Sequence, residues 1–498
     1  MNQIKAGAII SYFSVAVNLV IGLLYTPWMI QSLGKENYGL YILATSVITL
    51  FVFDFGLGNA VTRFIAKYIA EDNHIKLNRF IGLVVKLYFI IDIFLLVCLT
   101  SVYFCIPHIY QELSQFEIEK FKVVYVVAAS FSVISFPFVP LDGIISAHEK
   151  FVQLKLCDLI NKIVIVISMA ICLYLGYGLY ALVTVNALAG ILTILLKLGV
   201  IQKYIRVVPD FAYRSKSELK DILGYSGWVT ITALSQRLIF NIAPSILGIV
   251  SGSVEIALFG IASSFEGYIF SIANALNGLF LPKVTKISTK GEDILPLMVK
   301  IGRIQLYIVS LLVLGFVAVG QDFLQLWLGS GYESVYICVV LLVVPSIFYL
   351  PKMIANNAIL AQNLVKHQAS VFMLMGVFNL IVGYILADYF GAIGFSISIF
   401  CAYMIRSIGM DMIFYKDLNL DLVRFYRESY LSMTPQYILL LLISIVIANF
   451  WIATSWIYLL VKTASFICIY LYVIYAWAFN TSEKKLLASI DVRKRSNL

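Results

Sequence analysis

The sequence predicts an all-α protein that crosses a membrane many times. Hydrophobic residues make up 61% of its 498 residues, charged residues only 13%, and the mean hydropathy is +0.94. A soluble domain carries about 25% charged residues. About fourteen apolar stretches reach the roughly 17–25 residues that a bilayer requires. We predict spans at 6–30, 38–62, 80–104, 121–140, 156–175, 178–200, 222–250, 254–281, 301–320, 333–356, 367–387, 391–413, 432–452 and 455–479.

The basic residues predict the topology of these spans. Of the 36 Lys and Arg residues, 31 fall in alternate gaps, at the margins of these gaps and in the terminal segments. The other five are Lys35, Lys120, Lys122 and Lys462, which lie in the remaining gaps and their margins, and Arg237, which lies well inside a span. Cytoplasmic loops are the ones enriched in Lys and Arg. We therefore predict cytoplasmic N and C termini and a location in the bacterial cytoplasmic (inner) membrane.

Composition also argues against several classes of function. The net charge of +9 lies on loops between spans, where anionic membrane lipids are the expected partners and nucleic acid is not. The seven Cys residues form no C-x-x-C pair and the four His residues do not cluster, so we expect no metal site and no cofactor. The predicted outer loops are too short for a catalytic domain. We therefore expect a protein that is not an enzyme.

A weak internal repeat predicts the domain organisation. Residues 33–44 (LGKENYGLYILA) resemble residues 251–262 (SGSVEIALFGIA) at an offset of 218, so that Gly34 matches Gly252. Six predicted spans separate the copies, as in a parallel repeat; chance similarity between two glycine turns is the alternative. The repeat predicts two six-helix lobes at 1–220 and 221–430, two additional helices at 431–480 and a basic cytoplasmic tail at 481–498.

Two prolines stand near the predicted outer ends of the first helix of each lobe. Pro27 and Pro244 differ by one residue from the repeat offset. Proline removes a main-chain hydrogen bond and bends a helix. Both are candidate hinges for alternating access, and a role in packing is the equally weighted alternative.

Ionisable residues within the predicted spans are candidate functional groups. Four candidates are Asp54, Asp92, Arg237 and Glu266, and each costs roughly 2.5–3.5 kcal/mol on insertion scales. Position along each span gives the depth of a residue in the membrane. Similar depths suggest a pair between Arg237 and Glu266 and a pair between Asp54 and Lys86. Asp92 has no evident partner, which suits proton coupling. The alternative is that paired charges only hold helices together.

The cations favour an anionic substrate. Arg237 is predicted near the middle of the membrane, in a central cavity, with Arg63 and Lys67 near the cytoplasmic opening of that cavity. A guanidinium group binds phosphate through two hydrogen bonds and stays charged. Asn18, in the middle of the first span, is a further candidate for substrate binding, with an interhelical hydrogen bond as the alternative.

Five segments carry a recognisable order of motifs: 33–41 (LGKENYGLY), 54–66 (DFGLGNAVTRFIA), 140–150 (PLDGIISAHEK), 281–284 (LPKV) and 327–329 (WLG). Taken together, they resemble the Wzx-type polysaccharide repeat-unit flippases, which belong to the superfamily that includes MATE exporters and peptidoglycan-precursor flippases. The resemblance covers most of residues 1–415.

This resemblance implies a two-lobe fold of fourteen helices and no catalysis. It also implies transfer of an undecaprenyl-diphosphate-linked oligosaccharide, such as an O-antigen or capsule repeat unit, to the outer leaflet. Alternating access would be driven by H⁺ or Na⁺, and polysaccharide polymerase machinery would be a partner. One alternative is a MATE-like antiporter exporting small molecules, in which Asp54, Asp92 and Glu266 matter and Arg237 does not. A membrane-embedded polymerase or ligase is the second, although it should carry a sizeable outer loop.

Overall fold

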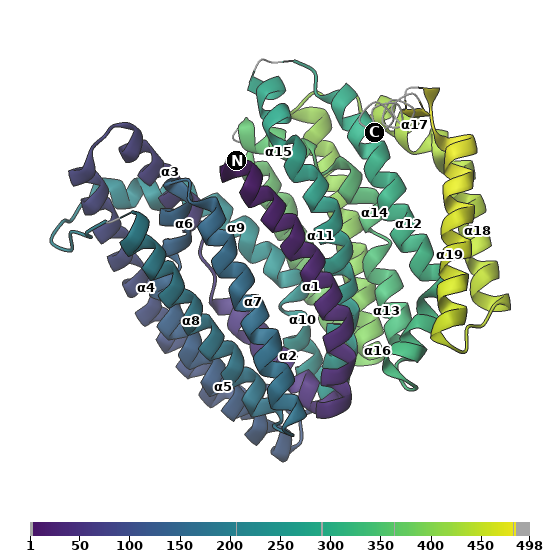
Figure 1. Cartoon of the computed structure of the whole chain (residues 1–498), viewed down its shortest axis with the longest axis horizontal. Helices are drawn as coiled ribbons and strands as arrows, with labels where there is room; N and C mark the ends of the chain where they lie inside the picture. The colour runs from purple at the N-terminus through teal and green to yellow at the C-terminus, as the bar shows by residue number, and fades with distance from the viewer. Residues whose placement is uncertain (1–2, 206, 290–291, 363, 482, 485–498) are drawn as a thin grey trace, which may run out of the picture. The chain divides into compact units, whose positions relative to one another are not determined.

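A computed structural model describes residues 3–205, 207–289, 292–362, 364–481 and 483–484 (Figure 1). Within this part of the chain all regular structure is helical, which confirms the predicted fold class. The longer helices are α1 (Gln3–Leu33), α2 (Lys35–Phe51), α3 (Leu57–Ala70), α4 (His74–Ile109), α5 (Gln115–Ser135), α6 (Pro140–Ala147), α7 (Phe151–Tyr174), α8 (Leu179–Tyr204), α9 (Lys216–Phe240), α10 (Ala243–Val250), α11 (Ser253–Thr289), α12 (Leu295–Leu328), α13 (Glu333–Val343), α16 (Val365–Lys416), α17 (Leu422–Ser429), α18 (Thr434–Phe450) and α19 (Trp456–Val473). The shorter elements are η1 (Phe136–Phe138), α14 (Ser346–Tyr349), η2 (Leu350–Lys352), α15 (Ala355–Ala361), η3 (Leu431–Met433) and η4 (Ile474–Ala478).

The chain is a multi-pass membrane protein. Ten described helices are long and apolar enough to cross a membrane, or up to eleven if α9 and α10 form one bent span. Fewer spans are recognised than predicted, partly because the predicted span at 38–62 is divided: α2 ends at Phe51 and α3 begins at Leu57. The spans predicted at 367–387 and 391–413 run together in α16, which bends at Gly391 with φ 56°. The number of spans and the cytoplasmic location of both termini stay predictions.

One compact unit comprises Met1–Ile261 and Val365–Ala402. Within it α4, α5, α8 and α7 run side by side, and α1 packs on α7 (Figure 1). Its core lies where α3 meets α4 and α6 and contains buried Leu57, Ile65, Phe80, Tyr88 and Phe136. Large apolar side chains are also exposed, such as Phe89, Ile93 and Val97 of α4, as expected for a helix that faces lipid.

The other compact unit comprises Ala262–Leu364 and Tyr403–Leu498. Helix α12 is its centre and contacts α13, α17, α18 and α19. Phe466 and Tyr470 of α19 and Leu440 of α18 pack in its core. Asp322 and Lys462 join α12 to α19 by a buried ion pair of 2.7 Å. The predicted division into lobes at 1–220 and 221–430 stays a prediction.

The two copies of the internal repeat share a local conformation. Gly34 lies between α1 and α2 with φ 81°, and Gly252 lies between α10 and α11 with φ 86°. Positive φ strongly favours glycine because it has no β-carbon. Pro27 lies inside the unbroken helix α1. Pro244 lies in the first turn of α10, after the 40° bend from α9. The structure thus places a bend near Pro244 and keeps α1 as one helix at Pro27.

Candidate functional site

The break between α2 and α3 forms the centre of the candidate site. Residues 52–56 interrupt the predicted span, and Phe55 and Gly56 both have positive φ, at 53° and 66°. Such a conformation in a bulky residue such as Phe55 is uncommon and must be held by its surroundings. The main-chain carbonyl of Asp54 accepts from Leu57 N at 2.9 Å, which closes the turn into α3. The break therefore places a carboxylate where the sequence predicted a continuous helix.

Of the two oxygens of the Asp54 carboxylate, one has a hydrogen-bond partner in the described part of the chain. Its Oδ2 accepts from the main-chain N–H of Gly58 at 3.2 Å, in the first turn of α3. Its Oδ1 is buried and has no hydrogen-bond partner in the described part of the chain. A β-carbon at Gly58 would lie 2.7 Å from Oδ2, so any larger residue there would displace the carboxylate from this position. Buried polar atoms without a partner are rare, and such an atom is a candidate for binding an ion, a proton or a ligand.

Arg237 of α9 contacts the other side of the break. Its Nη1 donates to the carbonyl of Thr49 in the last turn of α2, and its guanidinium lies 4.9 Å from the centre of the Phe53 ring. The last carbonyls of a helix have no partner within the helix and favour a cation. Asp54 is close enough to Arg237 for electrostatic interaction. Nη1 is its only hydrogen-bonding group in the described region, so Nε and Nη2 remain available.

Two other side chains in or next to α9 contact the break. The Thr230 hydroxyl donates to the carbonyl of Phe55. Asn241, directly after the helix, donates from Nδ2 to the side chain of Thr49, at Oγ1, over 3.1 Å. Arg237 and Thr230 thus supply hydrogen bonds to main-chain carbonyls at the break. Main-chain polar groups inside a membrane require such partners.

Two more unsatisfied groups lie on α4. The hydroxyl of Tyr88, a fully buried residue, has no partner in the described region and lies close enough to Asp54 for electrostatic interaction. Asp92, one turn further along α4, is buried, and its Oδ1 also has no partner there.

The predicted charge pairs differ from the partners found. The Lys86 ammonium donates to the carbonyls of Phe211 at 2.9 Å and Tyr213, and not to Asp54. Glu266 is buried in the other compact unit, where it accepts from the Tyr349 hydroxyl at 3.0 Å. Arg406 is the cation close enough to Glu266 for electrostatic interaction. The Asp54–Lys86 pair does not occur among the described ion pairs, and the Arg237–Glu266 pair stays a prediction.

The remaining predicted site residues are less informative. Arg63 and Lys67 lie on α3 and are exposed, and Lys67 lies 3.9 Å from Glu71. Asn18 lies in α1, but its side chain is outside the described region. Among the described residues no group of three or more His, Cys, Asp or Glu side chains has the geometry of a metal site.

Sequence reasoning missed a buried charge cluster around Lys352. The Lys352 Nζ donates to Asp411 at 2.6 Å, to the Tyr426 hydroxyl at 2.8 Å and to Ser407 at 2.9 Å. Arg406, next in sequence to Ser407, lies 4.7 Å from the centre of the Tyr349 ring. The sequence places Lys352 with a cytoplasmic gap, at the inner margin of the predicted span 333–356, but it is only 2% exposed. The signal that could have found the cluster is Asp411, a carboxylate within the predicted span 391–413.

Comparisons with known proteins agree with this architecture. A search of solved structures finds a lipid II flippase MurJ in an inward closed conformation, with a TM-score of 0.68 and 15% identity, covering 94% of this chain and 97% of that chain. An inward-facing multidrug resistance transporter of the MATE family gives a TM-score of 0.64 and 16% identity, with coverage of 82% and 98%. A MOP superfamily transporter from Pyrococcus furiosus gives a TM-score of 0.58 and 16% identity, covering 83% of this chain and 96% of that chain. These similarities show that the fold is the one shared by this superfamily.

Comparisons of sequence identify the family of this chain. The uncharacterized membrane protein MJ1375 of Methanocaldococcus jannaschii is 23% identical over 415 residues, which are 79% of this chain and 92% of the relative. The family model described as polysaccharide biosynthesis protein matches residues 4–288, more than half of the chain. The resemblance seen in the sequence is thereby confirmed. The chain belongs to the polysaccharide biosynthesis protein family of membrane proteins.

Proposed function

We propose that this protein is a flippase that moves an undecaprenyl-diphosphate-linked oligosaccharide from the cytoplasmic to the outer leaflet of the bacterial inner membrane. The observation that carries the proposal is Arg237, a half-buried cation beside a broken helix whose Nε and Nη2 groups have no partner in the described region. Two N–H groups on one side of a guanidinium match two phosphate oxygens. The family and the fold support a transport role, and this cation supports a phosphate-bearing substrate.

The coupling ion is proposed to act through Asp54, Asp92 and Glu266. Asp54 and Asp92 each have a buried oxygen without a partner in the described part of the chain. Binding of H⁺ or Na⁺ would satisfy such an oxygen, and its release would leave the oxygen unsatisfied again. The two states differ in local charge, which is what an ion-driven cycle of alternating access requires. No catalytic step is proposed, and polysaccharide polymerase machinery is a proposed downstream partner.

Substitution of Arg237 tests the proposed substrate. A strain lacking the gene is complemented with wild type, Arg237→Ala, Arg237→Lys or Asn241→Ala, and surface glycan and lipid-linked oligosaccharide are measured in spheroplasts. Asn241→Ala is the matched control because it removes a hydrogen bond to Thr49 without removing a charge. We expect Arg237→Ala to lose surface glycan at normal membrane abundance, Arg237→Lys to keep a fraction of it and Asn241→Ala to stay near wild type. Normal glycan in the Arg237→Ala strain would rule out this assignment.

The unsatisfied carboxylates also favour a second candidate, a MATE-like cation-coupled exporter of small molecules. This candidate requires Asp54 and Asp92 and leaves Arg237 dispensable. Deletion of the gene would then leave the glycan profile unchanged and raise sensitivity to cationic compounds. The same strains therefore distinguish the two functions.

A further inference from the structure

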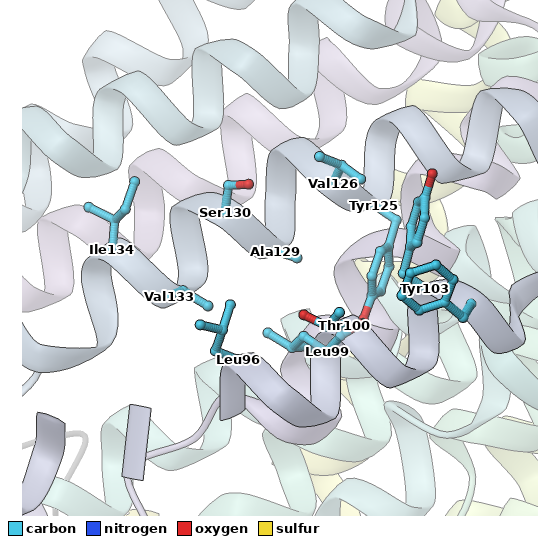
Figure 2. A pocket seen from close by; sticks show the side chains of 11 residues that line it. Leu96, Leu99, Thr100, Tyr103, Tyr125, Val126, Ala129, Ser130, Val133 and Ile134 are labelled. Carbon is cyan, nitrogen blue, oxygen red and sulfur yellow. The ribbon is translucent and has the colours of Figure 1, made fainter. Parts of the chain in front are cut away.

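A groove lies between α4 and α5, away from the break. Its volume is about 410 Å³, and Figure 2 shows Leu96, Leu99 and Tyr103 of α4 facing Val126, Ala129 and Val133 of α5 across it. The Tyr125 hydroxyl donates to the carbonyl of Leu99 at 2.9 Å and so holds the two helices together beside the groove. An apolar cavity of about 150 Å³ accommodates benzene. The groove therefore has room for a considerably longer hydrocarbon.

The length of the groove matches one leaflet of a bilayer. Its lining covers residues 96–104 of α4 and 125–134 of α5. At 1.5 Å per residue these stretches are roughly 12–14 Å long, close to half of the ~30 Å hydrocarbon core. Both helices are candidate membrane spans. The groove thus has the dimensions of a single lipid chain lying parallel to the helices.

A lysine marks the end of the groove at which α4 and α5 are joined. Lys122 precedes Val126 by four residues on α5, so the two share a helix face. Its Nζ lies 5.7 Å from the centre of the ring of Tyr103, which lines the groove. No carboxylate pairs with Lys122 in the described part of the chain. Lys120, two residues earlier, is already engaged, because its Nζ donates to Asn37 at 3.0 Å. Lys122 is therefore the cation available to a headgroup at this end.

We propose that this groove binds one acyl chain of an anionic phospholipid, with the lipid phosphate held by Lys122. The chain lies between α4 and α5, and the headgroup lies at the level of their connection. A long polyprenyl anchor is a poorer fit, because it is much longer than one leaflet while the groove is not. Under the predicted topology this is the outer leaflet. The site is separate from the Arg237 site and does not depend on which substrate the protein transports.

Native mass spectrometry of the full chain tests the site. Protein stripped of lipid is titrated with phosphatidylglycerol or phosphatidylcholine, and the first bound lipid is quantified. We expect phosphatidylglycerol to bind more tightly, and Lys122→Ala to weaken it by about fivefold, the effect of one lysine near an anionic surface. Lys122→Arg keeps the charge and should keep the preference. Ala129→Trp fills the groove and should remove this lipid, whereas Leu195→Trp, at an exposed position on α8 outside the groove, should not.

Two outcomes would overturn the proposal. Equal binding of both lipids by wild type and Lys122→Ala would mean that the groove holds only bulk bilayer lipid. Displacement of phosphatidylglycerol by undecaprenyl phosphate at equal concentration, blocked by Ala129→Trp, would mean that the occupant is the carrier lipid. Because Lys122 is only partly buried, Lys122→Ala is expected to fold normally even if Ala129→Trp does not.

Discussion

Ile42 and Gly260 pack against each other, and the 218 residues between them equal the offset of the internal repeat. Residues that a two-fold operation exchanges can touch each other only beside its axis. The contact therefore places a local pseudo-two-fold axis between α2 and the first turns of α11. Gly39 supports the same close approach, because a β-carbon there would overlap the carbonyl of Ser253. This helix crossing needs glycine on both sides.

The crossing predicts a specific destabilisation and its rescue. Gly260→Ala places a β-carbon in the volume of Ile42 Cδ1 and should cost about 1–3 kcal/mol, the usual effect of overpacking. Ile42→Val removes that methyl group, so the double variant should recover most of the loss. Thermal unfolding in detergent measures both. Gly267→Ala, where nothing lies within 4 Å of the added carbon, is the control. If the double variant were no more stable than Gly260→Ala, the contact would not be the cause.

Gly58 is predicted to be essential for transport because it keeps the Asp54 carboxylate in place. The alanine β-carbon of Gly58→Ala would lie 2.7 Å from Asp54 Oδ2 and displace the carboxylate. The lost charged hydrogen bond is worth about 1.5–3 kcal/mol, so we expect at least a tenfold loss of transport-dependent surface glycan at unchanged abundance. Gly227→Ala on α9 has open space and should be neutral. Full activity of Gly58→Ala would show that the position of Asp54 is unimportant.

The buried pair of Asp322 and Lys462 predicts strong coupling between α12 and α19. The two side chains are 8% and 1% exposed. Lys462→Met leaves a buried carboxylate unpaired and should cost about 3–5 kcal/mol, whereas replacing both residues by apolar ones should cost much less. A double-mutant cycle with Asp322→Leu, read by thermal unfolding, measures the coupling. Additive losses would mean that the pair contributes no interaction of its own. Asp322 also accepts a hydrogen bond from the Ala453 N–H at 2.9 Å. This hydrogen bond is lost both in the single Asp322 variant and in the double variant, so its free energy cancels in the cycle.

Glu483 predicts a pH dependence at the C-terminal end of the described region. Burial raises the pKa of Glu483, but hydrogen bonds from Arg303 and the Asn480 N–H outweigh it and lower the pKa below its usual value. Its Oε1 lies 2.7 Å from Arg303 Nε. A lowered pKa means that this stabilisation is complete above the ordinary pKa of about 4.3 and disappears as the pH falls through the folded value. Wild type should therefore exceed Glu483→Gln in melting temperature at pH 7, and the difference should shrink as the pH falls below about 4.3. A constant difference would show that the charge is not responsible.

The sequence predicted the helical class and the glycine turns because these depend on local composition. The apolar runs are continuous, and Gly34 and Gly252 stand where positive φ is needed. The break at 52–56 was missed, because residues 38–62 are apolar throughout most of their length and nothing in that pattern indicates positive φ at Phe55. Hydropathy describes transfer into the membrane but not helix continuity.

The candidate site was predicted by residue type but not by partner. Arg237, Asp54 and Asp92 were identified because charges inside a span are expensive. Their pairing was inferred from depth alone, which ignores rotation of each helix about its axis. Depth matched Lys86 to Asp54, but Lys86 reaches main-chain carbonyls near Phe211 instead. A one-residue change in helix phase rotates a side chain by about 100°, which is enough to exchange one partner for another.

The hydrogen bond from Arg237 to Thr49 gives one side chain two purposes. Nη1 completes the end of α2, while Nε and Nη2 are the groups proposed to hold a phosphate. A bound phosphate would therefore be connected through one planar group both to α9 and to the end of α2. Movement of α9 relative to α2 would shift the phosphate or break the Thr49 hydrogen bond, which would link occupancy of the site directly to helix movement.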